Sequence, residues 1–299
     1  MSKYTITTND LNDFLGFNIG YNDDGSMTLT MPKLLTATIL EFLHDDTTAD
    51  PSSPMSEHFN DPDQDASPRT DTARFLSLLG KLIYMVKCRP EIAYAISRLS
   101  CRSDRCTDKD WMSLLRVLRF LRATRDHGLT FSRANANDRH LMSTIFCYAD
   151  AAFNVHADSK SYSGYSVAHR TVCSTSARSS SPTSLSSTEA EGNAAVEAAK
   201  EIVWLRSLLA EIGYVQHEPT VLYADNKSMI TLCTEYSGNH KRVKHYLNRI
   251  NFMLEQVKTG VITLEYMPTT EHKADGLTKP LPPKQAAQSA IDLLGTSSL

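Results

Sequence analysis

The sequence predicts an α/β fold, because two short apolar runs each end on an acid and a long amphipathic helix separates them. The runs are Thr144–Asp150 and Thr220–Asp225, and both close on Tyr-Ala-Asp. β-Branched and aromatic residues fill them, as in buried strands. The helix is expected over Thr188–Ile212. Since open α/β sheets bind ligands at the carboxyl edge of their strands, the two acids are expected to share one crevice.

The elements beyond residue 143 are expected in the order strand, strand, strand, helix, strand, helix, helix, strand, helix. Further strands are predicted over Tyr162–Ala168, Thr171–Thr175 and Val261–Tyr266, and a last helical piece around Asp275. This alternation of strands and helices is typical of a sheet flanked by helices.

The upstream half has a different pattern. A hairpin around the Asn22–Gly25 turn is expected, followed by a helix. Three apolar helices are predicted between Arg74 and Phe131, the second opened by Pro90 and the third capped by Thr107. We therefore expect five segments: a hairpin plus helix over 1–44, an exposed acidic linker over 45–73, a helical part over 74–139, an α/β domain over 140–285 and a tail over 286–299.

Composition places the chain among globular proteins. It has 299 residues, of which 41% are hydrophobic and 22% charged, enough for about two domains with proper cores. No apolar run reaches the roughly 20 residues of a membrane span, and the N-terminus has no apolar leader core. We therefore expect an intracellular protein, cytoplasmic or nuclear, with no membrane partner. The six scattered cysteines are expected to be free thiols.

Charge is distributed unevenly along the chain. Residues 1–73 hold 3 Lys and Arg against 13 Asp and Glu, whereas residues 74–139 hold 14 against 6. A basic segment beside an acid-bearing one suits a polyanionic partner. Arg116, Arg119 and Arg122 run along one flank of the third predicted helix. We interpret them as phosphate contacts, because the guanidinium fork matches phosphate oxygens; an ordinary solvated helix face is the alternative.

Glu191 begins the stripe by which the long helix is expected to face the sheet. Apolar residues follow it at steps of four and three: Ala195, Ala198, Ile202, Leu205, Leu209 and Ile212. An acid on such a stripe is costly to bury without a compensating cation or proton, which favours a metal ligand. The alternative is a capping box that begins at Thr188. Glu189 falls off the stripe and is expected to face solvent or the helix dipole.

Asp150, Glu191 and Asp225 together predict a site for divalent cations. Each strand-end acid has an ordinary alternative, since Asp225 could cap the following helix and Asp150 could lie in a turn. Clustered carboxylates repel one another unless cations or protons intervene. Mg²⁺ prefers oxygen ligands, and two such ions suit an in-line displacement at a phosphodiester. By spacing alone, Asp275 is no better than a surface acid.

Several blocks of this sequence resemble the ribonuclease H domain of copia-type long-terminal-repeat retrotransposon polyproteins. They are Asp150, Ser186–Glu191, Tyr223–Ser228, Ala274–Leu281, Lys160–Tyr165 and Ala199–Leu205. Upstream blocks resemble the thumb and connection that follow a reverse transcriptase palm, and one resembles the last hairpin of the palm: Leu79–Tyr84, Arg89–Ala95, Gly128–Phe131 and Phe14–Gly16.

The resemblance implies a ribonuclease H-like fold, a mixed five-stranded sheet with flanking helices, preceded by a mainly helical thumb and connection remnant. It implies endonucleolytic cleavage of the RNA strand of RNA–DNA hybrids with two Mg²⁺ or Mn²⁺ ions. Carried over by motif, the catalytic residues and metal ligands are Asp150, Glu191, Asp225 and Asp275. The choice of strand would depend on 2′-hydroxyl contacts.

The sequence departs from the family pattern at several places. The polymerase signature Tyr-x-Asp-Asp is absent, because the two Tyr-Ala-Asp copies continue with Ala151 and Asn226. Reverse transcriptase activity is therefore not expected from this chain alone. Ala152 replaces a second Asp of the family, and the Ser-rich Arg178–Pro182 replaces a Lys-Gln segment. These changes are expected to affect binding of the hybrid more than binding of the metal.

Other basic and polar side chains are expected to contact the nucleic acid: Arg178, Asn226, Lys241, Arg242, Lys244 and Arg249. For the basic block around residues 241–249 a solvated helix start is the alternative, and the Asp and His that the family places after it are Leu247 and Asn251. His272 lies where some ribonucleases H carry a mobile histidine that aids product release, with a surface histidine as the alternative.

Two other functions stay open. The chain could be an inactive retroelement remnant that binds only nucleic acid or a polymerase partner, such as a reverse transcriptase palm and fingers supplied by another chain. An integrase or transposase of the same fold is less favoured, since the flanking blocks match the polymerase side.

Overall fold

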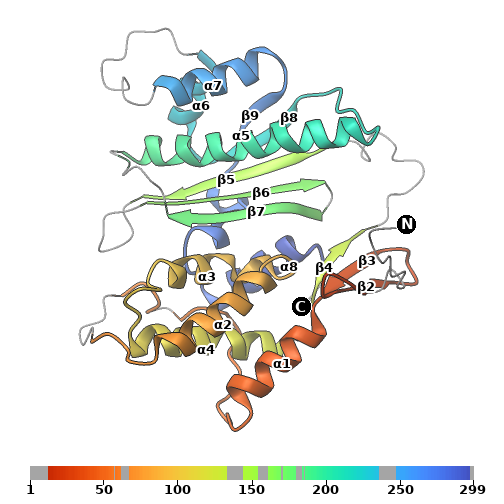
Figure 1. Cartoon of the computed structure of the whole chain (residues 1–299). Coiled ribbons are helices and arrows are strands. Elements are labelled where there is room, and N and C mark those ends of the chain that lie inside the picture. Colours follow the sequence, from red (N-terminus) through yellow and green to blue (C-terminus); the bar gives the residue numbers. More distant parts are fainter. Residues whose placement is uncertain are drawn as a thin grey trace, which may run out of the picture.

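The computed structural model describes residues 13–56, 58–61, 67–132, 144–153, 161–169, 171–179, 184, 186–235 and 247–296. Within these ranges the chain forms a four-stranded sheet, a five-stranded sheet and the helices that cover them (Figure 1). In this part of the chain, no helix is long and apolar enough to cross a bilayer. The cysteines described here, Cys88, Cys101, Cys106, Cys147 and Cys233, are free.

The five-stranded sheet has the order β7-β6-β5-β8-β9. Its strands are β5 Phe146–Ala152, β6 Tyr162–His169, β7 Thr171–Ser179, β8 Thr220–Ala224 and β9 Ile262–Tyr266. The first three form an antiparallel meander, whereas β8 and β9 run parallel to β5. This mixed sheet with flanking helices is ribonuclease H-like, and the predicted fold class and element order are confirmed.

Parallel pairing of β5 with β8 explains how two distant acids reach one edge. Tyr148 of β5 lies opposite Tyr223 of β8. Asp150 and Asp225 each follow these tyrosines by two residues. Because parallel strands in this register end at the same edge, both acids lie there.

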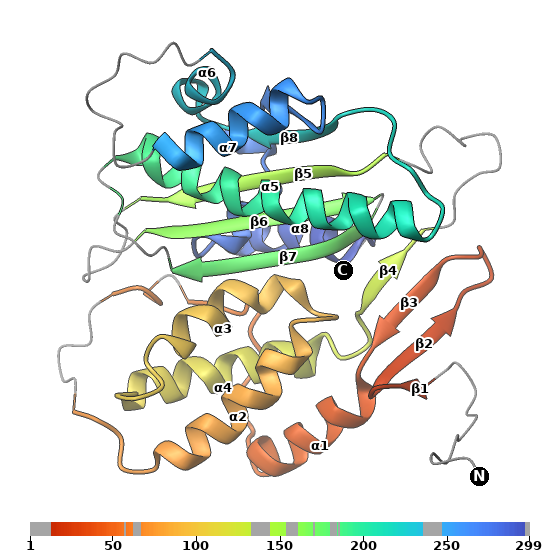
Figure 2. The same ribbon diagram turned by 45° about the horizontal axis from the view of Figure 1, so that its top comes forward.

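Helices cover both faces of this sheet. Helix α5 Ser187–Glu211 packs on one face, with α6 Lys227–Glu235 and α7 Leu247–Lys258 beside it (Figure 2). The other face is covered by the 3₁₀ turn η4 Asp275–Leu277, by α8 Pro283–Leu294 and by α3 of the upstream half. The prediction of a tail over residues 286–299 was wrong, because Leu293 and Leu294 are buried and α8 lies against the sheet.

The upstream half combines a small sheet with a group of helices. The sheet is formed by β1 Asp13–Phe14, β2 Phe17–Tyr21, β3 Met27–Thr30 and β4 Leu129–Phe131. The helices are α1 Pro32–Leu43, α2 Thr72–Met85, η1 Pro90–Ile92, α3 Ala93–Ser100 and α4 Asp108–Ala123. Thr107 caps α4 in a capping box with Asp110, as its sequence predicts. Most apolar residues of α2 are buried, whereas Ile83 is 48% exposed.

A shared core joins the helices of the upstream half to the five-stranded sheet. Tyr162 of β6 is fully buried among the helical core residues. Its ring meets Tyr94 edge-on with 5.1 Å between centroids, and its hydroxyl lies 3.1 Å from Ser97 Oγ. The contact positions the sheet on α3.

The acidic segment 45–73 is not an exposed linker throughout. Met55 and Phe59 are 6% and 8% exposed and belong to the core around α2 and α4. Asp46 and Asp50 form ion pairs with arginines of α4. The prediction of an exposed linker therefore does not hold for the part of the segment that packs against α4.

Candidate metal centre

Three predicted acids meet at the carboxyl edge of the five-stranded sheet. β5 carries Asp150, β8 leads directly into Asp225, and the first turns of α5 carry Glu191. One carboxylate oxygen from each lies within 4.8 Å of the other two. Asp150 also belongs to a second group, in which Asp275 and His272 offer ligand atoms within the same distance. The structure thus brings all four predicted acids to one place.

Glu191 reaches this place because the stripe of α5 packs on the sheet. Ala195, Ala198 and Ile202 on the same stripe are fully buried. Ser186 caps the helix, since its Oγ accepts a hydrogen bond of 3.2 Å from the Glu189 N–H. A cap that begins at Thr188 is therefore not the role of Glu191. Glu189 is only 9% exposed, so of the two expected environments it does not face solvent but lies in the first turn of α5, at the positive end of the helix dipole.

The electrostatics of the centre favour a cation. Burial, followed by the negative charges of Asp150 and Asp225, raises the pKa of Glu191 to about 10. Burial and the charge of Asp150 also raise the pKa of Asp275, and Lys279 offsets only part of this effect. Carboxyl groups whose ionisation is this costly become anionic when a divalent ion compensates them.

Protein donors hold one oxygen of three of these acids. Thr278 Oγ1 donates to Asp150 Oδ2, and Thr269 Oγ1 donates to Asp225 Oδ2 at 2.7 Å. Lys279 Nζ lies 2.9 Å from Asp275 Oδ2. Such contacts fix the orientation of carboxylates for a metal.

Two oxygens of the cluster are left over. Glu191 Oε2 and Asp275 Oδ1 are buried and have no hydrogen-bond partner within the described part of the chain. Buried polar atoms are normally satisfied, so these two need a further partner. They can only accept or ligate when ionised, and hard divalent cations such as Mg²⁺ and Mn²⁺ take oxygen ligands of this kind. The residues present therefore fit a divalent-metal site.

Gly164 allows the segment that carries Asp275 to approach Asp150. It lies directly opposite Asp150 in β6. A Cβ at this glycine would lie 2.8 Å from both Leu277 Cβ and Thr278 Cγ2. A larger residue would push these two away, so the absence of a side chain brings η4 and Thr278 onto the sheet.

Comparison with known proteins identifies the family. No family model matches the chain. It is 34% identical over 214 residues to the retrovirus-related Pol polyprotein from transposon RE2 of Arabidopsis thaliana, and 33% identical over 211 residues to that from transposon TNT 1-94 of Nicotiana tabacum. The chain belongs to the copia-type Pol polyproteins. These alignments cover 71% and 70% of this Pol homologue but only 14% and 15% of the two relatives.

Other relatives of this Pol homologue are shorter or more distant. It is 38% identical over 135 residues to the secreted RxLR effector protein 161 of Plasmopara viticola, which covers 44% of this chain and 90% of that protein. LC11-RNase H1 from compost matches 50% of this chain and 99% of its own, with a TM-score of 0.36 and 15% identity. The foamy viral protease-reverse transcriptase in complex with RNA/DNA hybrid matches 90% and 32%, with a TM-score of 0.44 and 15% identity. At such scores the fold assignment depends on the strand order.

His272 in this Pol homologue is not a surface histidine. It is 5% exposed, and its ring meets Tyr148 edge-on at 5.8 Å between centroids. Nε2 lies 3.3 Å from the carbonyl oxygen of Tyr223. The surface alternative was therefore wrong, and a role in product release stays a prediction.

Two of the three arginines that were predicted to contact phosphates, Arg119 and Arg122 of α4, form ion pairs within the chain. Arg119 pairs with Asp46 at 2.7 Å, with the two side chains 10% and 13% exposed. Arg122 pairs with Asp50 at 2.7 Å and donates to backbone carbonyls of the same segment. Arg116 has a buried Nε, and burial beside Arg119 lowers its pKa. Arg119 and Arg122 therefore contact the chain's own acidic segment, which argues against the solvated-face alternative, and their contact with phosphates stays a prediction.

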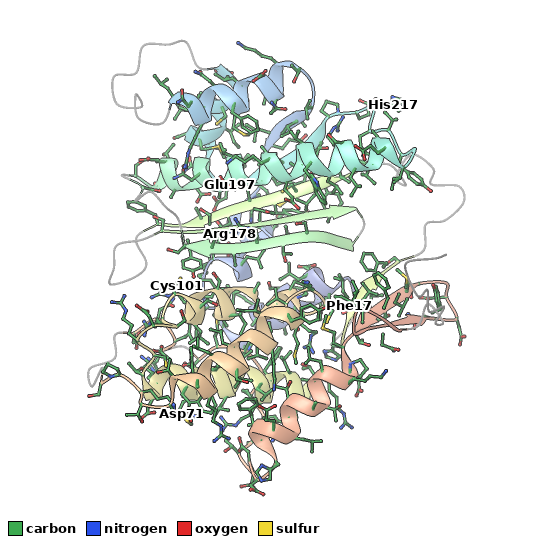
Figure 3. All side chains as sticks on the ribbon, viewed as in Figure 1. Phe17, Asp71, Cys101, Arg178, Glu197 and His217 are labelled. Atoms are coloured by element: carbon green, nitrogen blue, oxygen red, sulfur yellow. The ribbon has the colours of Figure 1, made fainter. Side chains whose placement is uncertain are left out.

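The remaining candidate contacts to nucleic acid differ in their surroundings. Asn226 caps α6, since its Oδ1 accepts from the Met229 N–H at 3.0 Å, which removes capping as a role for Asp225. Arg249 donates to Asn193 of α5 and is only partly exposed. Arg178 is exposed on β7 (Figure 3) and is still predicted to contact nucleic acid. Lys241, Arg242 and Lys244 lie outside the described residues.

Sequence reasoning missed the residues that support the acids. Thr278 and Lys279 follow Asp275 by three and four residues, a spacing that puts them on the same turn and could have indicated their role. Gly164 lies in a block that the resemblance included, without a reason for its glycine. Thr269 lies in a loop, and no pattern in the sequence points to its contact with Asp225.

Proposed function

We propose that this chain is the ribonuclease H portion of a copia-type Pol polyprotein and hydrolyses the RNA strand of RNA–DNA hybrids. The observation that best supports it is the convergence of Asp150, Glu191 and Asp225, with Asp275 joined through Asp150. The buried, unpartnered oxygens of Glu191 and Asp275 add the need for a cation. We place the nuclease part over residues 140–285, with α8 extending its support to Leu294.

The four acids would hold two divalent ions, Mg²⁺ or Mn²⁺. When bound, such ions lower the pKa of a water molecule and offset the negative charge on the leaving 3′ oxygen. The protein's own part is to keep the carboxylates aimed at one point. Thr278 and Thr269 fix Asp150 and Asp225 by hydrogen bonds, and the stripe of α5 keeps Glu191 at the sheet edge.

Lys279 provides positive charge inside the cluster. Burial alone would lower its pKa, but the hydrogen bond to Asp275 and the charges of Asp150 and Asp225 raise it. The ammonium group therefore stays charged and neutralises part of the repulsion among the acids. It also keeps Asp275 Oδ2 engaged, which leaves Oδ1 for a ligand.

The substrate follows from the same proposal. LC11-RNase H1 and the foamy viral protease-reverse transcriptase were both solved in complex with RNA/DNA hybrid. A hybrid would approach the acidic edge, with Arg178 a candidate contact to its backbone. Discrimination of RNA from DNA requires contacts to the 2′-hydroxyl. A palm and fingers supplied by another chain stay a predicted partner.

A labelled RNA–DNA hybrid tests the proposal directly. The full chain in Mg²⁺ is expected to cleave the RNA strand, and Asp225→Asn is expected to abolish cleavage. Asp126→Asn is the matched control, because the Asp126 side chain is 93% exposed and its partner, Arg125, is 3.9 Å away; this variant is expected to cleave like the wild type. Undiminished cleavage by the Asp225 variant would contradict the metal site.

The same assay separates the enzyme from a binding remnant. A wild-type chain that binds the hybrid with cations present and never cleaves it would favour the non-enzymatic alternative. The departures at Ala152 and at the Ser-rich segment after Arg178 are the sequence features that favour that alternative.

A further inference from the structure

His272 has two ring nitrogens in different environments. Nε2 lies 3.3 Å from the Tyr223 carbonyl oxygen. Nδ1 is buried and has no hydrogen-bond partner among residues that the structure describes. An ordinary buried histidine satisfies both nitrogens, so the unpartnered Nδ1 requires an explanation.

The carbonyl contact determines which nitrogen carries the proton. A carbonyl oxygen can only accept a hydrogen bond, so Nε2 must be the protonated nitrogen. In the neutral ring the lone pair is then on Nδ1. A backbone carbonyl that fixes the tautomer from behind is the usual support of a metal-binding histidine.

The ring lies beside two of the acids of the proposed metal centre. A ligand nitrogen of His272 and one oxygen each of Asp150 and Asp275 lie within 4.8 Å of one another. Asp275 Oδ1 is also buried without a partner. His272 Nδ1 and Asp275 Oδ1 are therefore two partnerless acceptor atoms on residues of the same group, and neither can donate to the other when Nε2 carries the ring proton and Asp275 is ionised.

We propose that His272 is a nitrogen ligand to a divalent metal ion held between Asp150 and Asp275, so that this position favours transition metals such as Mn²⁺ over Mg²⁺. The assignment rests on the proposed function, because it places the ligand at the same centre. It adds a residue to the four acids and makes the two metal positions chemically unequal.

The chemistry of the ligand set accounts for this preference. The group of Asp150, Glu191 and Asp225 offers only oxygen, which suits Mg²⁺. The group that contains His272 offers one imidazole nitrogen with two carboxylates. Imidazole binds first-row transition metals better than Mg²⁺. Edge-on packing against Tyr148 holds the ring in place, so the nitrogen is preorganised.

Pulsed electron paramagnetic resonance of the full chain with Mn²⁺ tests the assignment without relying on activity. A directly bound imidazole produces ¹⁴N modulation in the spin echo of Mn²⁺. We expect this modulation in the wild type and in His217→Gln, a control on an exposed histidine between α5 and β8 (Figure 3). We expect its loss in His272→Gln, together with a Mn²⁺ affinity lower by roughly 10–100-fold. His272→Asp replaces nitrogen with oxygen and should keep Mn²⁺ bound without the modulation.

The outcomes distinguish this assignment from the function on which it rests. Mn²⁺ that binds the wild type, depends on Asp150 and shows no ¹⁴N modulation would overturn the role of His272 alone. Modulation that survives in His272→Gln would overturn it as well. If the wild type binds no Mn²⁺, or if its Mn²⁺ binding is unchanged in Asp150→Asn, the metal centre itself is contradicted. The assignment of His272 as a ligand then fails as well.

Discussion

The sequence predicts two regions that act on or contact a nucleic acid: the acidic edge of the five-stranded sheet and the arginine flank of α4. In the structure these two regions have different surroundings. At the edge, Asp150, Glu191 and Asp225 converge, and one oxygen each of Glu191 and Asp275 is buried without a hydrogen-bond partner in the described part of the chain. On α4, Arg119 and Arg122 are already paired with acids of the chain itself. The comparison shows that spacing along an element places a side chain, whereas a local charge count does not identify its partner.

The physical reason lies in what each pattern constrains. The stripe from Glu191 to Ile202 fixes a face of a helix, and a face must lie on the sheet if the core is to be buried. The excess of arginine on α4 determines only a positive local electrostatic potential and does not determine which anionic group binds there. That potential was neutralised by Asp46, which lies 73 residues away in the sequence from Arg119, and no local pattern encodes so distant a pair.

The largest expected effect separates the acids of the two regions. Asp150→Asn should reduce hydrolysis of the hybrid by about a thousandfold, since loss of metal-assisted charge stabilisation costs several kcal/mol. It should not lower the free energy of unfolding of the metal-free chain, because it removes repulsion. Asp46→Asn should do the reverse: hydrolysis within about twofold of wild type, and unfolding easier by about 1–3 kcal/mol. Hybrid cleavage assays measure the first effect and urea unfolding measures the second. If both variants changed cleavage and stability in the same way, the two regions would not differ in function.

The second prediction concerns the cost of keeping Glu191 in the cluster without metal. Its pKa is raised from 4.5 to about 10, so the folded chain keeps the proton after the unfolded chain has lost it. The contribution of protonated Glu191 to the free energy of unfolding is therefore fully present below about pH 4.5 and is lost as the pH rises toward 10. In EDTA at pH 8, Glu191→Gln should raise the free energy of unfolding by roughly 2–4 kcal/mol.

Its control is Glu197→Gln, a partly exposed acid on the same helix that pairs with Lys200 at 2.7 Å. Loss of a surface pair of this kind should change stability by less than about 1 kcal/mol. The gain from Glu191→Gln should also disappear near pH 4. Denaturant unfolding at several pH values measures both, and a gain that does not vary with pH would show that repulsion is not its cause.

The fold and the acids could be predicted because each rests on a periodic pattern. Two strands ending on Tyr-Ala-Asp, and a helix whose stripe begins at Glu191, determine where three acids meet. Asp275 was different: spacing gave no reason to choose it, and only the resemblance did. The contact of Thr269 with Asp225 and the close approach at Gly164 depend on how loops close over the sheet, which no local pattern describes.

The third prediction examines the ion pair between Asp46 and Arg119, an arginine that the sequence predicts to contact phosphate. Arg119→Ala should lower the free energy of unfolding by about 1–3 kcal/mol, because it leaves Asp46 largely buried without its partner. Burial opposes ionisation of Asp46, but hydrogen bonds from Thr48 and Arg119 outweigh it and lower its pKa to about 2. The contribution of this carboxylate is thus present above about pH 4 and is lost as the pH falls toward 2. Urea unfolding should show a difference between wild type and variant that is full at pH 6 and shrinks by pH 3.

The smallest expected effect compares two arginines that the sequence assigned the same role. Arg178 is exposed on β7, whereas the Arg122 side chain is 23% exposed and paired with Asp50. Each phosphate contact contributes about 0.7–0.9 to the slope of log affinity against log salt concentration. With a catalytically inactive Asp225→Asn background, Arg178→Ala should flatten this slope by about that amount, and Arg122→Ala should leave it unchanged. Fluorescence anisotropy of a labelled hybrid across a salt series measures the slopes.

A flatter slope for Arg122→Ala would mean that the hybrid displaces Asp50 from its arginine. The acidic segment would then act as an internal competitor for the phosphate backbone, and the two regions would differ in degree only. If both variants and the parent show the same slope, neither arginine contacts the phosphates of the hybrid. Because Arg178 lies on the sheet that carries Asp150, the slope also reports whether the backbone passes over the sheet that positions the acids.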